Sequence, residues 1–135
     1  MVWWHELKDI SLPIRFQIPR GYCEYGKSQY NQLTLGISDE TFLEWFKNVE
    51  NTLIVTPGPI DTRVKEKTLT VKYVDGFSQV FDSSDVLMVD GHSFIECEMD
   101  CLVEIDKVYS LNGNQGVTCK IFQVRVIPHI VCMFH

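Results

Sequence analysis

The segment from Asp100 to Ile127 constrains the fold most, because two long runs of strand-like sequence flank one short turn. The first run alternates, and one of its faces is formed by Cys101, Val103, Ile105, Lys107 and Tyr109. The second run alternates between a face with Thr118, Lys120, Phe122, Val124 and Val126 and a face with Val117, Cys119, Ile121, Gln123 and Arg125. Period-2 runs joined by a polar turn with Asn and Gly predict a β-hairpin. Cations and aromatic side chains on these strands favour a binding surface.

Other strands are expected before this hairpin. Alternating apolar residues predict strands over 12–18, 30–37 and 68–74, and shorter strands over 80–81, 86–89 and 93–98. The glycine-flanked segment 21–26 is interpreted as a turn. These elements indicate a mainly β chain.

One helix is predicted over 38–53. Apolar side chains recur there at helical spacing: Phe42, Leu43, Trp45, Phe46, Val49 and Leu53. Ser38 or Asp39 is expected to cap the helix, and Glu44, Lys47, Asn48 and Glu50 are expected on its solvent side. The 135 residues, of which 45% are hydrophobic, are enough for one packed core, so we expect a single domain over 1–135. Strand periodicity alone leaves open whether the strands form an OB-like barrel, an SH3-like barrel or a small sandwich.

The hairpin also carries a family resemblance. Val108 before Tyr109, and then G-V-T-C-K-I-F-Q-V-R-V over 116–126, resembles the closing hairpin of OB-fold single-stranded DNA-binding proteins of large eukaryotic DNA viruses, the type found in African swine fever virus and its relatives. The similarity continues through 30–53 and 68–74. It implies an α+β, mainly β fold, an OB-like β-barrel with one substantial helix. It also implies sequence-nonspecific binding of single-stranded DNA in viral DNA replication or repair.

The charge of the chain bears on this function in two ways. The formal net charge of −6 opposes binding to a polyanion. The charges are segregated along the sequence, however, because Arg63, Lys65, Lys67 and Lys72 lie close together, whereas nine acids and no Lys or Arg lie between Asp75 and Asp106. We therefore expect a basic face, with the acids of 75–106 on another side. The alternative is that both runs are solvated loops and strand edges.

Single-strand binding requires cations for phosphates and flat side chains on which bases stack. The candidate cations are Arg63, Lys65, Lys67, Lys72, Lys107, Lys120 and Arg125, and the candidate stacking residues are Tyr73, Tyr109 and Phe122. Lys120 and Phe122 share a predicted strand face, which suits a base stacked beside its phosphate. For Phe122 a place in the core is an equally good interpretation.

Catalytic and metal motifs are missing from the sequence. It contains no GxGxxG, GxxxxGK[ST], HExxH or GxSxG pattern, so we expect neither an enzyme nor a cofactor. His129, Cys132 and His135 would point to alternating faces of an extended chain, which disfavours a shared metal. Five scattered cysteines indicate buried, reduced thiols and no disulfide.

The second interpretation is a protein-interaction or assembly domain that uses the acidic 75–106 segment and the apolar chain ends, Trp3–Trp4 and Met133–Phe134. The expected partners are single-stranded DNA, with RNA left open, and a second copy of the chain or replication proteins. No apolar run approaches the roughly 20 residues of a membrane helix, so no membrane partner is expected. The first residues lack a secretion signal, so we expect an intracellular protein of the host nucleus or a cytoplasmic viral factory.

Overall fold

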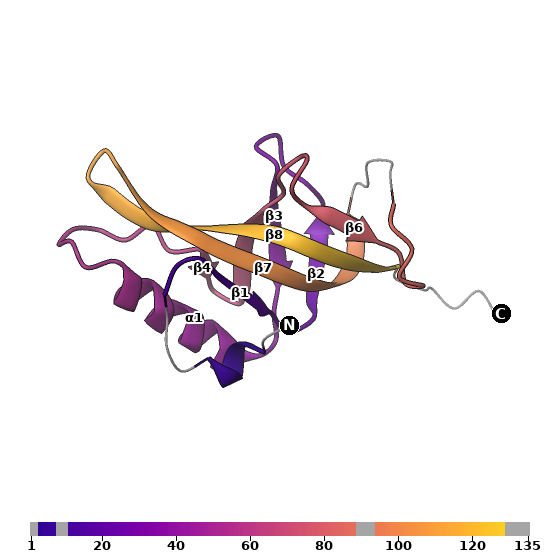
Figure 1. The fold of residues 1–135 in the computed structure, drawn as a ribbon, viewed down its shortest axis with the longest axis horizontal. Helices are drawn as coiled ribbons and strands as arrows, with labels where there is room; N and C mark the ends of the chain where they lie inside the picture. Colours follow the sequence, from indigo (N-terminus) through magenta and orange to yellow (C-terminus); the bar gives the residue numbers. More distant parts are fainter. Residues whose placement is uncertain (1–2, 8–10, 89–93, 129–135) are drawn as a thin grey trace.

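A long β-hairpin runs the length of the molecule (Figure 1). The structure is a computed structural model that describes residues 3–7, 11–88 and 94–128. The hairpin consists of β7 (Ile95–Leu111) and β8 (Asn114–Pro128). Asn112 and Gly113 between them have φ of 52° and 83°, the positive values that a two-residue type I′ hairpin turn requires. The predicted hairpin is therefore confirmed.

Five strands close into a barrel. β2 (Gly21–Tyr25), β3 (Gln32–Gly36) and β5 (Thr68–Lys72) complete a ring with β7 and β8. The ring closes through a parallel β5–β8 contact, in which Lys72 and Lys120 are register partners, and its other neighbours are antiparallel. A small Greek-key barrel of five strands is the OB architecture. The predicted OB-like, mainly β fold is confirmed.

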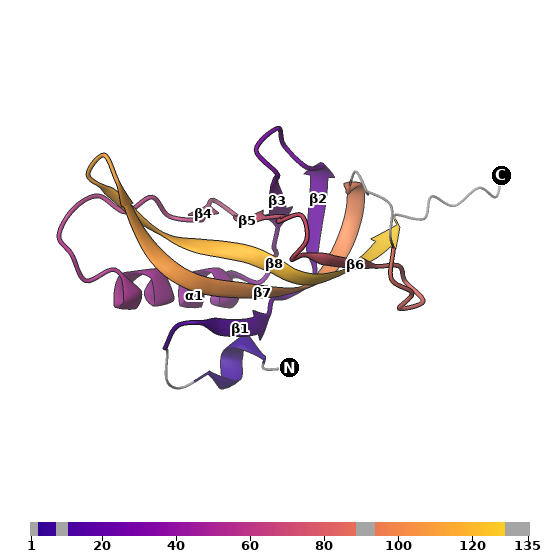
Figure 2. The same ribbon diagram turned by 45° about the horizontal axis from the view of Figure 1, so that its top comes forward.

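Three short strands and one helix complete the described part of the chain. β1 (Ile14–Gln17) pairs with β7, β4 (Val64–Lys65) with β5, and β6 (Gln79–Phe81) with β8. A single 3-10 turn, Trp4–Glu6, precedes them. Figure 2 shows α1 (Glu40–Leu53) beneath the long hairpin, with β2 and β3 running across it. Among the described residues, no helix is long and apolar enough to cross a membrane.

The helix forms where the sequence predicts it. Asp39 caps it, because its Oδ1 accepts a hydrogen bond of 3.0 Å from the backbone N–H of Phe42. Phe42, Phe46 and Val49 are buried in the core, which excludes Phe46 from stacking on bases. Trp45 is half-buried, and its ring centroid lies 5.2 Å from that of Phe16.

The core of the protein is apolar. Its largest fully buried side chains include Phe16, Leu33, Leu35, Leu69, Met99, Ile105 and Ile121. Cys23, Cys97, Cys101 and Cys119 are free and buried among them, as predicted for small apolar thiols. Burial raises the pKa of Cys119 to about 12, so this thiol stays protonated. Cys132, His129 and His135 lie outside the described residues.

Two of the predicted boundaries are wrong. Residues 21–25 form β2 and not a turn, because the chain pairs there with both β3 and β7 and buries Cys23. Residues 86–88 do not form a strand, since their only ladder contact is an isolated bridge from Leu87 to Phe81. Val86 and Leu87 are exposed as a result.

The predicted faces of β8 hold only as far as Phe122. A β-bulge lies where Leu102 and Val103 pair with Gln123 and Ile121, so Phe122 is an extra residue in the ladder. Beyond it Val124 and Val126 are buried and Arg125 faces outward. The prediction that Val124 shares a face with Lys120 is therefore wrong.

Candidate nucleic-acid interface

A groove of about 450 Å³ lies over β3, β5 and the projecting end of the hairpin. Five of the predicted site residues line it: Arg63, Lys72, Lys107, Tyr109 and Lys120. They come from three separate parts of the chain, and the barrel brings them together. Asp61 and Asp106 line the same groove.

Lys72 and Lys107 are the groove's free cations. Lys72 is the last residue of β5, at the point where the barrel closes on Lys120 of β8. Lys107 lies at a second irregularity of the hairpin, between the pairs Ile105–Cys119 and Val108–Val117. Both lysines are exposed, and within the described ranges neither has an ion-pair partner. Their charges are available to a ligand.

The loop before β4 is fastened to the hairpin through Gln115. The backbone of Gln115 donates to Pro59 O at 3.0 Å and accepts from Asp61 N at 2.6 Å, while its side chain donates to Pro57 O at 2.9 Å. A Cβ on Gly58 would lie 2.9 Å from this side-chain nitrogen, so glycine permits the close approach. Figure 1 shows the loop beside the hairpin tip. This attachment carries Asp61 and Arg63 to the groove.

Tyr109 lies across β8 where a glycine leaves room for its ring. Its register partner is Gly116, and a Cβ there would be 2.5 Å from the Tyr109 hydroxyl oxygen. The hydroxyl donates to Asp61 Oδ2 at 2.8 Å and accepts from Arg63 Nη2 at 3.1 Å. Burial, followed by the hydrogen bond to Asp61, raises the pKa of Tyr109, so the phenol stays protonated. The ring is held at the groove wall.

A buried carboxylate supports the same loop. Glu50 of α1 is 1% exposed and accepts from the Thr62 hydroxyl at 2.5 Å and from the Arg63 backbone N–H at 2.8 Å. The prediction that Glu50 lies on the solvent side of the helix is wrong, because these two donors satisfy it inside. Burial raises the pKa of Glu50, against the lowering effect of both hydrogen bonds.

Two acids of the 75–106 segment lie at the groove cation Lys120, so the prediction that these acids lie on another side is wrong for Glu104 and Asp106. Lys120 Nζ lies 3.2 Å from Asp106 Oδ2 and 3.5 Å from Glu104 Oε2. The cause is the hairpin register, which pairs Glu104 with Lys120 across the two strands. Burial raises the pKa of Asp106, but hydrogen bonds from Thr118 and Lys120 outweigh it, so the pKa is lowered.

The sequence interpretation missed aromatic residues in the loop between β2 and β3. Tyr25 and Tyr30 are 81% and 71% exposed, and Lys27 Nζ lies 4.7 Å from the ring centroid of Tyr73. OB-folds bind oligonucleotides on the face of their second and third barrel strands and on the flanking loops. Here those strands are β3 and β5, with outward side chains such as Gln32. Three tyrosines around a Gly-Lys-Ser turn were the available signal.

Four predicted residues, in β4, on either side of β5 and in β8, do not line the groove. Lys65 and Lys67 are exposed in and after β4, and Lys67 Nζ is 3.7 Å from a carboxylate oxygen of Glu40. Tyr73 is half-buried, with its ring 5.7 Å from that of Phe94. Phe122 is half-buried on the outside of the barrel, where Arg15 Cζ lies 3.9 Å from its ring centroid. These residues are not brought together with Tyr109.

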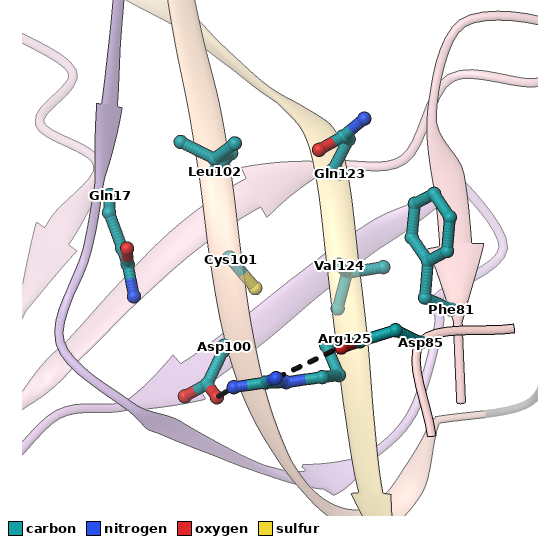
Figure 3. A pocket seen from close by; sticks show the side chains of 9 residues that line it. All are labelled: Gln17, Phe81, Asp85, Asp100, Cys101, Leu102, Gln123, Val124 and Arg125. Atoms are coloured by element: carbon teal, nitrogen blue, oxygen red, sulfur yellow. Dashed lines mark hydrogen bonds and ion pairs between the residues drawn. The ribbon is translucent and has the colours of Figure 1, made fainter. Parts of the chain in front are cut away.

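Arg125 lies in a second hollow of about 210 Å³ (Figure 3). Its guanidinium reaches across to Asp100 at 2.7 Å and to Asp85 at 3.3 Å. Arg20 also binds Asp100, at 2.9 Å, and this hydrogen bond is the main reason that the pKa of Asp100 is lowered. The charge of Arg125 is thus matched inside the protein. Among the described residues, no group of three or more His, Cys, Asp and Glu side chains could hold a metal ion.

Comparison with known proteins gives a structural match. No protein-family model matches the chain, and no curated protein matches its sequence. The fold is similar to that of a phage protein. The phage protein is gp2.5, a single-stranded DNA-binding protein encoded by bacteriophage T7, and its crystal structure matches this chain with a TM-score of 0.60. The match covers 87% of this chain and 93% of the phage chain, at 13% identity, and supports the OB-like fold.

Proposed function

We propose that this protein binds single-stranded DNA without sequence preference, in the groove over β3, β5 and the hairpin. One observation carries the proposal: Lys72 and Lys107, which have no ion-pair partner in the described part of the chain, line the same groove as the ring of Tyr109. The position of this groove on the ligand-binding face of an OB-like barrel supports the same function.

The two kinds of side chain have separate roles. Lys72 and Lys107 attract phosphates, and each neutralised phosphate releases counterions. Tyr109, and the exposed Tyr30 of the neighbouring loop, offer flat surfaces on which bases stack, worth about 1–3 kcal/mol per base. Stacking and phosphate contacts depend little on base identity, so no sequence preference is expected.

The groove also explains how a chain of net charge −6 binds a polyanion. Four cations and two carboxylates line it, so its local charge is positive although the molecule is acidic. Binding is expected to weaken as salt rises, because each phosphate contact releases counterions.

We further propose a role in protecting or organising single strands during viral DNA replication or repair, in the host nucleus or a cytoplasmic viral factory. The similarity of 116–126 to the African swine fever virus type supports the viral assignment. The similarity in fold to a phage single-stranded DNA-binding protein supports the general activity. RNA is the alternative ligand, and replication proteins or a second copy of the chain are further partners.

A second candidate function is protein interaction through the acidic segment. Val86 and Leu87 are 58% and 48% exposed in the loop after β6, and Ile95 is 54% exposed at the start of β7. Apolar side chains exposed among acids suit a partner protein that carries apolar and basic groups.

A fluorescence-anisotropy titration separates the two functions. The protein is titrated into a labelled single-stranded oligonucleotide and into its duplex, each at two salt concentrations. We expect tighter binding to the single strand and a loss of affinity as salt rises. If neither oligonucleotide binds even at low salt, the interaction function is favoured.

A further inference from the structure

Two of the four groove cations already have a carboxylate partner inside the groove. Arg63 Nη2 lies 2.6 Å from Asp61 Oδ2, and Lys120 Nζ lies 3.2 Å from Asp106 Oδ2. Lys72 and Lys107 have no such partner among the described residues. The groove therefore offers two free cations and two that are occupied.

Both carboxylates are held in place by groove residues. Tyr109 donates its hydroxyl hydrogen bond to Asp61, and the Thr118 hydroxyl donates one to Asp106. The side chains of Asp61 and Asp106 are 51% and 30% exposed, so both carry their negative charge at the groove surface. A phosphate that approaches Arg63 or Lys120 meets one of these negative charges.

Glu104 is a second carboxylate partner of Lys120. It is 6% exposed and binds Arg15 at 2.9 Å as well as Lys120 at 3.5 Å. Lys120 therefore lies between two carboxylates, Asp106 and Glu104.

We propose that Asp61 and Asp106 determine the preference of this groove for single strands over duplex DNA. The proposal rests on the proposed function. Duplex DNA carries a charge about every 1.7 Å of its axis, twice the density of one strand, and its bases are stacked inside, so non-specific duplex binding comes almost entirely from phosphates. The two carboxylates weaken that contribution, and the rigid duplex cannot avoid them.

A single strand is affected less. Its flexible backbone can place phosphates at Lys72 and Lys107, away from both carboxylates, while its bases stack on Tyr109. Asp61 and Asp106 therefore weaken duplex binding more than they weaken single-strand binding. Repulsive groups create specificity in this way.

The test compares Asp61→Asn and Asp106→Asn with the wild-type protein. Asparagine keeps one oxygen that accepts the hydrogen bond from Tyr109 or Thr118, and it replaces the other carboxylate oxygen by an uncharged NH2 group, which removes the negative charge. Glu44→Gln is the matched control, because Glu44 is exposed on α1 and does not line the groove. Anisotropy titrations measure the dissociation constants of each variant for a single strand and for a duplex of equal length.

We expect each groove variant to bind duplex about tenfold more tightly and single strand less than about threefold more tightly, with no change in the control. Unchanged melting temperatures verify that the variants fold. Equal gains for both ligands, or no gain for either, overturn the proposal while leaving single-strand binding intact. A wild-type protein that binds no single strand overturns the proposed function itself.

Discussion

At the scale of single residues, two exposed lysines on neighbouring strands differ in whether they line the groove. Lys72 lines the groove at the end of β5, and Lys65 of β4 lies outside it. Both came from one basic run of the sequence, 63–72, and sequence alone could not distinguish them. The barrel register does so, because it makes Lys72, and not Lys65, the partner of Lys120.

Lys72→Ala is expected to weaken single-strand binding to a similar extent for all sequences. It should also make the slope of log affinity against log salt about 0.7 units less steep, because one phosphate contact is lost. Lys65→Ala removes the same charge outside the groove and is expected to leave the slope unchanged. Equal slopes for the two variants in anisotropy titrations would place the phosphate contacts elsewhere.

Tyr30 tests the stacking contribution of the loop between β2 and β3. Because Tyr30 is 71% exposed, Tyr30→Ala should weaken single-strand binding by about 1–3 kcal/mol with little change in salt slope or melting temperature. Tyr22→Ala, on β2 outside the groove, is the control with unchanged affinity. If the Tyr30 variant binds as tightly as the wild type, the loop does not contribute a stacking surface.

Glu50 predicts a pH dependence of stability. Its folded-state pKa is raised above 4.5, so the folded state binds this proton more tightly than the unfolded state. The free energy of unfolding should therefore gain a contribution as pH falls through the raised pKa toward 4.5. Glu50→Gln lacks this contribution. Denaturant unfolding of both proteins across this pH range measures it, and a constant difference between them would contradict the prediction.

At the scale of elements, the hairpin was the most predictable part and also the part where prediction failed in detail. Its period-2 pattern and its Asn-Gly turn locate both strands. The bulge at Phe122 has no sequence signal, since it depends on the register with Leu102 and Val103. Tyr109 was a candidate binding residue from the sequence. Its pairing with Gly116 across the hairpin could not be predicted, because it depends on the strand register.

Gly116→Ala tests this element. A Cβ at position 116 would displace the Tyr109 ring and break its hydrogen bonds to Asp61 and Arg63. We expect a loss of single-strand affinity of about 1–3 kcal/mol, similar to the loss of one stacked base. Gly36→Ala is the control, because its Cβ would meet only one atom, at 3.6 Å. Equal affinities of the two variants would exclude Tyr109 from the interface.

At the scale of the whole molecule, the fold class could be predicted and the charge distribution could not. Strand periods and one capped helix are local features, and they predicted a mainly β chain with a helix over 38–53, where the structure has α1 over 40–53. The choice of an OB-like barrel came from the family resemblance. Charges segregated along the chain mix in space, because antiparallel pairing sets Glu104 opposite Lys120 and the bulge turns Arg125 toward Asp100. Glu50 was misplaced because its donors, Thr62 and Arg63, belong to the loop after α1, and helical periodicity does not show that this loop folds back against the helix.

The position of the ligand on the whole surface is the most direct test of single-strand binding in the groove. Backbone amide chemical shifts are measured by NMR while a single-stranded oligonucleotide is added at low salt. The largest changes are expected in 26–34, 61–63, 68–72, 106–111 and 116–120, and none at Asp85 or Arg125 in the second hollow. Changes centred on Arg125 and Asp85, or no changes at all, would contradict binding in the groove.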